Sequence, residues 1–337
     1  MDELNSADAV VIGAGHSGCE AAKLIACEGF RTLLLNINLD AIALVSGDPL
    51  MNISGADVGL IDRIGIMERP VGMIETNMLV IDKREYFIYM KECMENIEHL
   101  QVKQAEATGI IEQNGGFVIR SRLGDEYRAK TVVICAGTFL KARCVYDGHK
   151  TPGGRHGEIA SDDLCKNLEE MGYEFTDSAV SSSHVVRIAR ELEEECEKIE
   201  IKYYCSKTNL KTTPKYCYLY KLEDDHSLLF VPLGVRSFEY YVSKYYSKKV
   251  PVKVFNSSIK RLEDKFLVMP TRAPYKVKYR VLKSKYFIGS NKELSVQSGM
   301  FFAGAMCGST SIFQSIIDGI TAGRDAVSYL KSKVKQS

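Results

Sequence analysis

The sequence predicts an α/β protein, in which a Rossmann-like dinucleotide-binding domain is built from two chain segments and a smaller α+β domain is inserted between them. Three observations carry this prediction. A strand, a glycine-rich turn and a helix open the chain, a second apolar strand ends in Ala-Gly-Thr at 136–138, and a strand, turn and helix return after Gly299. Repeated strand-turn-helix units build parallel sheets. We expect the first domain at 1–145 and 272–337, and the inserted domain at 146–271.

The opening unit predicts where a ligand binds. A buried strand is expected over 7–13, a helix from Gly15 to about Glu28, and a second strand over 31–35. The turn reads Gly13-Ala14-Gly15-His16-Ser17-Gly18. In such a turn the first glycine permits the tight bend, the second lets the backbone approach a diphosphate, and the third lets helix and strand pack closely. Because free amides and the helix dipole favour an anion there, all six residues are candidate cofactor contacts.

The end of the second strand distinguishes between nucleotides. An acidic residue about 20 residues after the glycine turn usually binds the ribose. This chain has Asn36 there, which can hydrogen-bond a hydroxyl but carries no charge. Asn36 therefore disfavours NAD at this position and stays a candidate cofactor contact.

The rest of the first segment alternates between irregular and regular stretches. Residues 36–80 look irregular, and no helix or strand is expected over 43–59. Apolar spacing predicts a helix over 83–97. Short strands are expected near 100–104, 108–112 and 117–122, and a buried strand over 131–135.

The inserted segment differs in composition. It predicts a helix over 161–171 with Ser161 as N-cap, an acidic helix over 185–199, and strands and loops over 201–271. Residues 202–285 hold 19 Lys and Arg against 6 Asp and Glu, together with 11 of the 18 tyrosines. Such a segment fits the phosphates and stacked bases of an RNA. It fits equally well the exposed strands of a lysine-rich small domain.

Two further segments favour FAD over NAD as the cofactor, because a protein that binds FAD must also hold its flavin end. Residues 132–138 resemble the second strand of flavoproteins, and 301–305 resemble the strand that returns to the flavin. The helix expected from Ser309 to Leu330 points its N-terminus at the pyrimidine edge, where its dipole stabilises an anionic reduced ring. The additional candidate flavin contacts are Ala136, Gly137, Thr138, Gly304, Ala305, Ser309, Thr310 and Ser311.

The same segments make the chain similar to the MnmG (GidA) family, flavoproteins that modify the wobble uridine of tRNA. The matching segments are 13–22, 137–140, Gly153-Gly154-Arg155, Pro-Lys-Tyr-Cys at 214–217, and Phe-Phe-Ala-Gly at 301–304. The resemblance implies a glutathione-reductase-type FAD domain in two halves, with further FAD contacts at Glu106 and Ser161. It also implies NADH as reductant, a folate one-carbon donor, a GTPase partner, and a nicotinamide segment whose Cys217 is the candidate catalytic residue.

The chain departs from this family at three places. Gly47 stands where the family has a cysteine, and Ala305 replaces a glutamine. The chain ends before the C-terminal helical region that docks the GTPase and tRNA, so we do not expect the GTPase partner. The shorter TrmFO group, folate- and FAD-dependent uridine methyltransferases, is a related alternative.

Composition limits the remaining choices. The ten cysteines contain no Cys-x-x-Cys pair, which argues against a metal site and against a disulfide framework. No apolar run approaches the roughly 20 residues of a membrane span, and the start lacks the features of a signal peptide. We expect a cytoplasmic protein, with a homo-oligomer left open.

The leading functional interpretation is flavin-dependent tRNA uridine modification, in which NAD(P)H reduces the flavin and the flavin reduces a one-carbon adduct. The first alternative is an FAD-dependent NAD(P)H oxidoreductase acting on a small molecule. The second is a non-catalytic flavin-binding subunit of a complex, which the missing cysteine at position 47 favours.

Overall fold

A computed structural model of the 337-residue chain divides it into two compact units. Unit 1 comprises Met1–Val45, Pro49–Val180 and Val277–Ser337, and unit 2 comprises Ser46–Asp48 and Ser181–Lys276. The assignment of a flavin domain and a nicotinamide domain to the ranges given above stays a prediction. The structure describes residues 5–46, 50–53, 56, 58–75, 78–81, 83–146, 149–155, 157–181, 184–188, 201–203, 215–217, 219–221, 227–231, 269–272, 276–286, 299–309 and 311–334.

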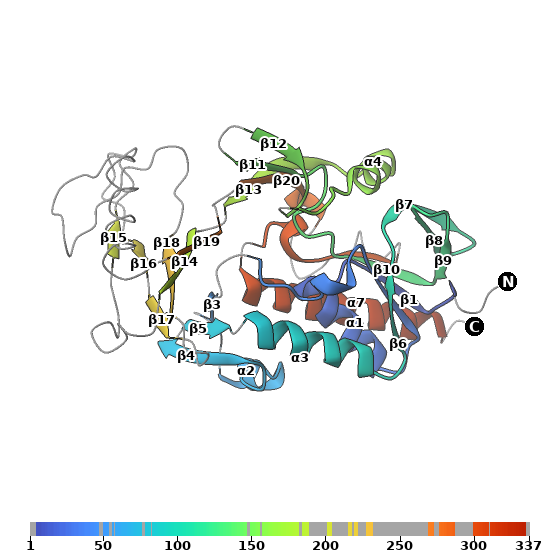
Figure 1. Ribbon diagram of the computed structural model, residues 1–337. Coiled ribbons are helices and arrows are strands. Elements are labelled where there is room, and N and C mark those ends of the chain that lie inside the picture. Colours follow the sequence, from blue (N-terminus) through green and yellow to red (C-terminus); the bar gives the residue numbers. More distant parts are fainter. Residues whose placement is uncertain are drawn as a thin grey trace. The chain divides into compact units, whose positions relative to one another are not determined.

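The centre of unit 1 is a five-stranded sheet (Figure 1). Its strands, in spatial order, are β21 (Met300–Phe302), β10 (Thr131–Ile134), β1 (Ala9–Ile12), β2 (Thr32–Asn36) and β6 (Leu100–Gln104). All four neighbouring pairs are parallel. β1, β10 and β21 are wholly buried apolar runs, apart from a threonine that opens β10, as expected of a parallel sheet covered on both faces. The two ends of the chain therefore meet in one sheet.

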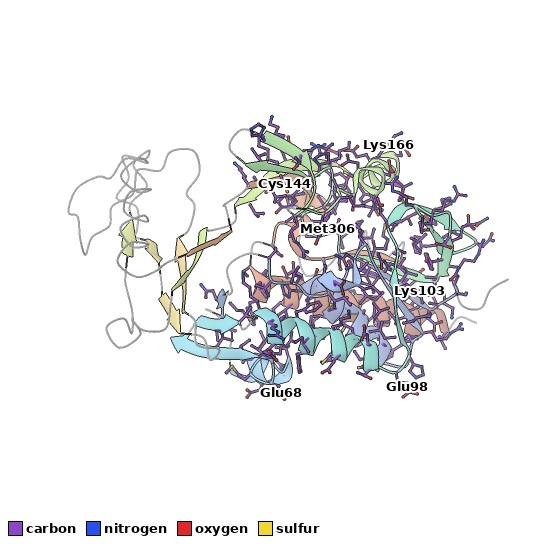
Figure 2. The ribbon with its side chains drawn as sticks, viewed as in Figure 1. Glu68, Glu98, Lys103, Cys144, Lys166 and Met306 are labelled. Carbon is purple, nitrogen blue, oxygen red and sulfur yellow. The ribbon has the colours of Figure 1, made fainter. Side chains whose placement is uncertain are left out.

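Successive residues of β1 face opposite cores, because side chains alternate along a strand. Val11 packs in a cluster with α1 (His16–Cys27), α3 (Lys83–Asn96) and α7 (Ile312–Val334). Val10 packs in a second cluster with the sheet of β7 (Ala107–Gln113), β8 (Gly116–Ser121) and β9 (Glu126–Ala129). Met306, labelled in Figure 2, is fully buried in that second cluster.

Helices α1 and α7 lie side by side because glycines let their backbones approach (Figure 1). A Cβ at Gly319 of α7 would overlap the backbone of Ser17 in α1, and one at Gly323 would lie 3.1 Å from Cα of Ala21. The C-terminal helix is thereby held against the start of α1.

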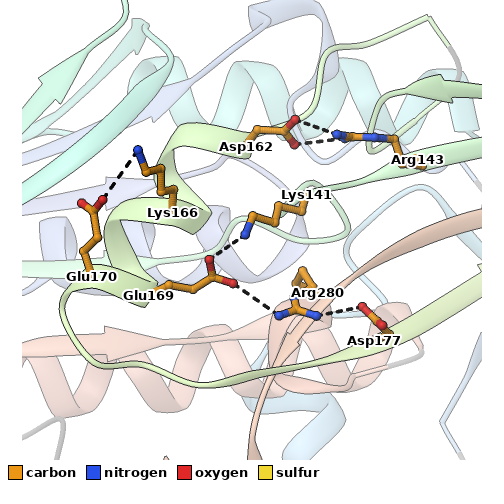
Figure 3. A network of polar contacts seen from close by, with 8 residues as sticks. All are labelled: Lys141, Arg143, Asp162, Lys166, Glu169, Glu170, Asp177 and Arg280. Carbon is orange, nitrogen blue, oxygen red and sulfur yellow. Dashed lines mark hydrogen bonds and ion pairs between the residues drawn. The ribbon is translucent and has the colours of Figure 1, made fainter.

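A four-stranded sheet contains the strands that precede and follow unit 2 in the sequence. Its order is β12 (His149–Pro152), β11 (Arg143–Tyr146), β20 (Lys276–Leu282) and β13 (Phe175–Ser181). An ion-pair network ties it to α4 (Asp162–Glu170), as Figure 3 shows. Arg280 on β20 reaches Glu169 on α4 at 3.3 Å and Asp177 on β13 at 3.0 Å. Lys141 contacts the other oxygen of Glu169 at 2.6 Å, and both cations lower the pKa of that carboxyl.

The expectation of an irregular stretch over 36–80, with no helix or strand over 43–59, is wrong. The structure has a three-stranded antiparallel sheet of β3 (Leu50–Asn52), β5 (Met78–Ile81) and β4 (Val71–Glu75), with α2 (Val58–Arg63) and the short helix η2 (Leu39–Ala41). Pairing joins Met51 to Leu79, and both side chains are fully buried. These strands are too short to show periodicity, so only pairing between distant segments reveals them.

The expected helix over 185–199 is wrong where the structure describes it. β14 (His184–Ile188) is a strand between β18 (Ser227–Val231) and β19 (Met269–Arg272), and residues 189–200 lie outside the described part. The Val-Val-Arg-Ile sequence of β14 is largely β-branched, which suits a strand with partners on both sides. The strands expected over 201–271 also include β15 (Ile201–Tyr203), β16 (Lys215–Cys217) and β17 (Leu219–Lys221). In the described residues, no helix has the length and apolarity needed to span a bilayer.

Candidate cofactor site

The turn between β1 and α1 contains glycines of two kinds. Gly13 has φ +97°, and a Cβ there would overlap the carbonyl oxygen of Cys135; a Cβ at Gly18 would overlap that of Gly13. The protein's own packing therefore requires these two glycines. Gly15 is exposed, and a Cβ there would meet nothing within 4 Å. The missing side chain at Gly15 leaves room beside the backbone for a ligand.

The start of α1 favours an anion. Gly15 is its N-cap residue, no side chain caps the helix, and its first turn holds no acidic residue. The first amides of a helix have no partner within it, and the helix dipole adds positive charge at that end. This is the position at which the sequence predicts a diphosphate.

Asn36 lies beside the turn but already has partners. Its Oδ1 accepts a hydrogen bond from the amide of Ala14 at 3.0 Å, and its Nδ2 donates to the carbonyl of Asn38 at 2.6 Å. The side chain thus ties the end of β2 to the glycine turn. One lone pair and one N–H remain for a ribose, so the predicted contact stays a prediction.

The second predicted segment forms a tight turn after β10. Ala136 is buried, Gly137 has φ +56°, and the hydroxyl of Thr138 donates to the carbonyl of Gly154 at 2.8 Å. Ser161 sits at the N-cap position of α4 as predicted, but its side chain makes no capping hydrogen bond. Its amide donates instead to the carbonyl of Phe139 at 2.9 Å, which joins the segment 153–161 to this turn.

The third segment follows β21. Gly304 has φ +80°, and a Cβ there would overlap the hydroxyl of Ser17. Ala305 follows in the short helix η5 (Gly304–Cys307). The helix expected from Ser309 begins at Ile312. The hydroxyl of Ser311 accepts a hydrogen bond from the amide of Gln314 at 3.1 Å. Ser309 hydrogen-bonds Asp318 of α7, and Thr310 lies outside the described residues.

The three segments meet at one edge of the central sheet. β1, β10 and β21 are adjacent parallel strands, so the loops after them emerge on the same side, where open α/β sheets bind ligands. Gly13 lies against Cys135, and Gly304 against Ser17. The candidate contacts at 13–18, 136–138 and 304–305 are therefore neighbours.

One predicted residue, Glu106, does not join this group as a free side chain. Both carboxylate oxygens of Glu106 lie 2.7 Å from the guanidinium of Arg122, which also pairs with Asp163 at 2.8 Å. Cys217 ends β16 in unit 2, and its side chain lies outside the described part. The predicted FAD contact of Glu106 and the catalytic role of Cys217 stay predictions.

Residues 8–231 match the family model of glucose-inhibited division protein A. The chain belongs to this family. It is 37% identical over 185 residues to the tRNA uridine 5-carboxymethylaminomethyl modification enzyme MnmG of Geobacter metallireducens, covering 49% of this chain and 30% of that one. It is 26% identical to MnmG of Lachnoclostridium phytofermentans, over 97% of this chain and 62% of the relative. The chain thus spans about a third to two thirds of the length of these relatives.

Solved structures of the GidA family confirm the predicted fold class. A crystal structure of Aquifex aeolicus GidA matches with a TM-score of 0.76 at 22% identity, covering 98% of this chain and 64% of that one. The GidA-related protein of Thermus thermophilus matches with a TM-score of 0.55 at 17% identity, covering 97% of this chain and 98% of that one. At these identities the likeness establishes an α/β fold built on a parallel sheet.

This GidA-family chain also contains a buried polar network that the sequence did not reveal. Nη1 of Arg69 lies 2.7 Å from Oε1 of Glu20 in α1 and donates to the hydroxyl of Tyr86 at 3.2 Å. The Arg69 and Glu20 side chains are 3% and 6% exposed, so each needs the other as counter-charge. Burial raises the pKa of Tyr86 to about 12, although Arg69 opposes it. Arg69 comes from the stretch expected to be irregular, and no local pattern indicates its partner.

His16 connects this network to the glycine turn. Its ring centroid lies 5.8 Å from that of Tyr86. Burial, and then the charges of Arg69 and Arg155, lower the pKa of His16 to about 4, so the imidazole is neutral near pH 7. Its Nδ1 is buried without a hydrogen-bond partner among the described residues. The side chain therefore retains a polar atom for a ligand at the start of α1.

Two cysteines that pack against the glycine turn, Cys19 and Cys135, show no sign of reactivity. Cys19 and Cys135 are buried, and burial raises the pKa of the Cys135 thiol to about 12 despite a hydrogen bond with Ser17. Burial also raises the pKa of Cys19. Because the thiolate is the reactive form, both residues serve in packing.

Proposed function

We propose that this chain binds FAD non-covalently in unit 1 and works in the flavin-dependent modification of a tRNA uridine. The observation that carries the first half is the meeting of the loops after β1, β10 and β21 around a helix start without a side-chain cap. Family membership, and relatives named as tRNA uridine 5-carboxymethylaminomethyl modification enzymes, support the second half.

The residues present fit this cofactor. Gly15 leaves room beside the backbone, and Nδ1 of His16 is a buried polar atom that needs a partner. In the proposed complex the amides of 13–18 hold the diphosphate, Asn36 lies toward the ribose, and the turns at 136–138 and 304–305 border the flavin. FAD, when bound, supplies a ring that accepts a hydride from NAD(P)H and passes it on.

The start of α7 would orient and polarise the flavin. Ser311 caps this helix, and the positive end of the helix dipole favours the negative charge that a reduced ring carries. Met306 and Ala303, between β21 and α7, are both buried. The nicotinamide site around Cys217 and tRNA binding by the basic segment 202–285 belong to the same proposal and rest on the family resemblance and the charge of that segment.

Gly15→Ala tests FAD binding sharply. A Cβ there meets no protein atom within 4 Å, and its φ of −73° suits any residue, so the apoprotein should keep its thermal stability. A ligand backed against the turn would clash with that Cβ. We expect the variant to lose at least about 10-fold in FAD affinity, measured by flavin fluorescence titration, which corresponds to roughly 1.4 kcal/mol.

Gly109→Ala is the matched control, because its Cβ meets only the Asn167 side chain at 3.8 Å. It should bind FAD as the unaltered chain does. Equal FAD affinity in Gly15→Ala would contradict the proposed placement of the diphosphate. A chain that takes up no FAD at all would contradict the cofactor assignment.

Stopped-flow reduction separates the functional classes. For the proposed tRNA chemistry, NADH or NADPH should bleach the flavin absorbance. In the presence of a folate one-carbon donor, tRNA should accelerate the reoxidation of the flavin. The tRNA should then contain a modified uridine, which nucleoside mass spectrometry detects. Bleaching without any effect of tRNA would indicate an oxidoreductase for a small molecule. A bound flavin that neither nucleotide reduces would indicate a non-catalytic flavin-binding subunit.

A further inference from the structure

Arg155 lies beside the cofactor turn, and the glycine motif does not include it. The segment that carries it is held against the turn after β10, because the hydroxyl of Thr138 donates to the carbonyl of Gly154 at 2.8 Å. On β11, Sγ of Cys144, which Figure 2 labels, donates to the carbonyl of Gly153 at 3.3 Å. A Cβ at Gly154 would overlap the ring of Phe139, so only glycine lets the backbone lie directly on that ring. This packing fixes the position of the backbone at Arg155.

That place is close to the start of α1. β10 and β1 are neighbouring parallel strands, so the turn under Arg155 and the turn at 13–18 share one edge of the sheet. The guanidinium carbon lies 5.8 Å from the centroid of the Phe139 ring. Its charge, after burial and the charge of Arg69, contributes to the lowered pKa of His16.

Each of the two side chains has a buried polar atom that makes no hydrogen bond within the part of the chain that the structure describes. The Arg155 side chain is 18% exposed, and its Nη1 lies 3.3 Å from Oε1 of Glu158. The two groups are close enough for an ion pair, but their geometry does not make a hydrogen bond. The buried Nη1 therefore has no hydrogen-bond partner among the described residues. Nδ1 of His16 is in the same condition. A buried donor or acceptor without a partner destabilises the protein, so two such atoms at one edge of the sheet indicate a polar ligand there.

We propose that Arg155, with His16 as a second polar contact, binds the cofactor's diphosphate together with the amides at the start of α1. The inference rests on the proposed FAD function and adds a binding residue from outside the glycine motif. A guanidinium presents a planar fork of donors that matches phosphate oxygens. Glu158 and the Phe139 ring hold this fork in position before the ligand arrives.

The test compares Arg155→Met, Arg155→Lys and the unaltered chain as apoproteins titrated with FAD at low and high salt. Methionine keeps the aliphatic contact with Phe139 but removes the charge, and lysine restores the charge without the fork. We expect Arg155→Met to weaken FAD binding by at least about 10-fold, as for a lost hydrogen bond to a charged group. Its FAD affinity should also depend less on salt, and Arg155→Lys should recover part of the loss.

Arg120→Met is the matched control, because Arg120 is an exposed hairpin residue whose side chain pairs with Glu126; its FAD affinity should stay within about 2-fold of the unaltered chain. Thermal unfolding of each apoprotein confirms that it folds. Unchanged FAD affinity in Arg155→Met, or a loss with unchanged salt dependence, would overturn the proposal and leave FAD binding standing.

If the unaltered chain takes up no FAD, the proposed function is wrong. The role of Arg155 is then tested by comparing ADP binding to the unaltered chain and to Arg155→Met. ADP carries a diphosphate without a flavin. Weaker ADP binding by Arg155→Met would still support a diphosphate site, and equal ADP binding would overturn it.

Discussion

The buried side and the open end of α1 differ in what surrounds them. On the buried side, Gly18 and the facing Gly319 are glycines because neighbouring backbone occupies the space of a Cβ. At the open end, a Cβ at Gly15 would meet nothing within 4 Å, and Nδ1 of His16 has no partner among the described residues. One short motif therefore combines residues that the protein's packing requires with residues whose chemistry is left for a ligand. Substitutions on the two sides should separate stability from binding.

Arg69→Met should give the largest effect on the buried side. It leaves the Glu20 carboxylate buried without a counter-charge, so we expect the free energy of unfolding to fall by about 3–5 kcal/mol in urea titrations. Lys91→Met, which removes an ion pair whose Asp40 side chain is 84% exposed, is the control and should cost at most about 1 kcal/mol. The double variant Glu20→Gln with Arg69→Met should recover part of the loss. A single-variant loss below about 1 kcal/mol would show that the pair is not needed.

Gly319→Ala should have an intermediate effect. Alanine raises helix propensity by about 1 kcal/mol over glycine, yet here its Cβ overlaps the backbone of Ser17. We expect a net loss of about 1–3 kcal/mol in unfolding free energy, because overpacking forces the helices apart. Gly15→Ala is the comparison on the open end and should leave stability unchanged. A stabilised Gly319→Ala would mean that α1 and α7 do not pack this closely.

His16 stands between the two sides and should produce the smallest effect near neutral pH, because its effect appears only as a pH dependence below about pH 6.5. Its pKa is about 4 in the folded chain against an ordinary value of 6.5. Between these values the unfolded chain binds more protons, so the stability of the apoprotein falls as the pH drops from about 6.5 to about 4, by at most ~1.4 kcal/mol per pH unit.

The measurement is urea unfolding across that window for the unaltered chain and for His16→Gln. The variant should lose stability less steeply as the pH falls. His149→Gln, at an exposed strand position, should keep the slope of the unaltered chain. Identical slopes for all three proteins would mean that His16 is not held in its neutral form.

The regular elements around the cofactor turn could be predicted because their signals are local. The helix expected over 83–97 is found at Lys83–Asn96, and the strand over 100–104 is found at Leu100–Gln104. Each has a periodic apolar pattern or a run of apolar residues that neighbouring residues alone establish. The glycine turn could also be predicted locally, because three glycines within six residues determine its backbone conformation.

Elements that depend on distant partners could not be predicted. The acidic run after Ile188 favoured a helix, but β14 is a strand because β18 and β19 pair with it on both sides. β3 is three residues long and exists through pairing with β5, whose partner residues lie almost thirty positions further along the chain, as Met51 with Leu79 shows. Tertiary pairing overrode weak local preference in both cases.

The sequence by itself determined the fold class and the position of the glycine turn, because glycine spacing and buried apolar strands act over a few residues. The tertiary structure alone decided which polar groups remain for a ligand. It tied the side-chain amide of Asn36 to Ala14 and the carboxylate of Glu106 to Arg122, and it placed Arg155 over the ring of Phe139. A side chain's hydrogen-bond partners come from any part of the folded chain, so no local pattern of residues reveals them.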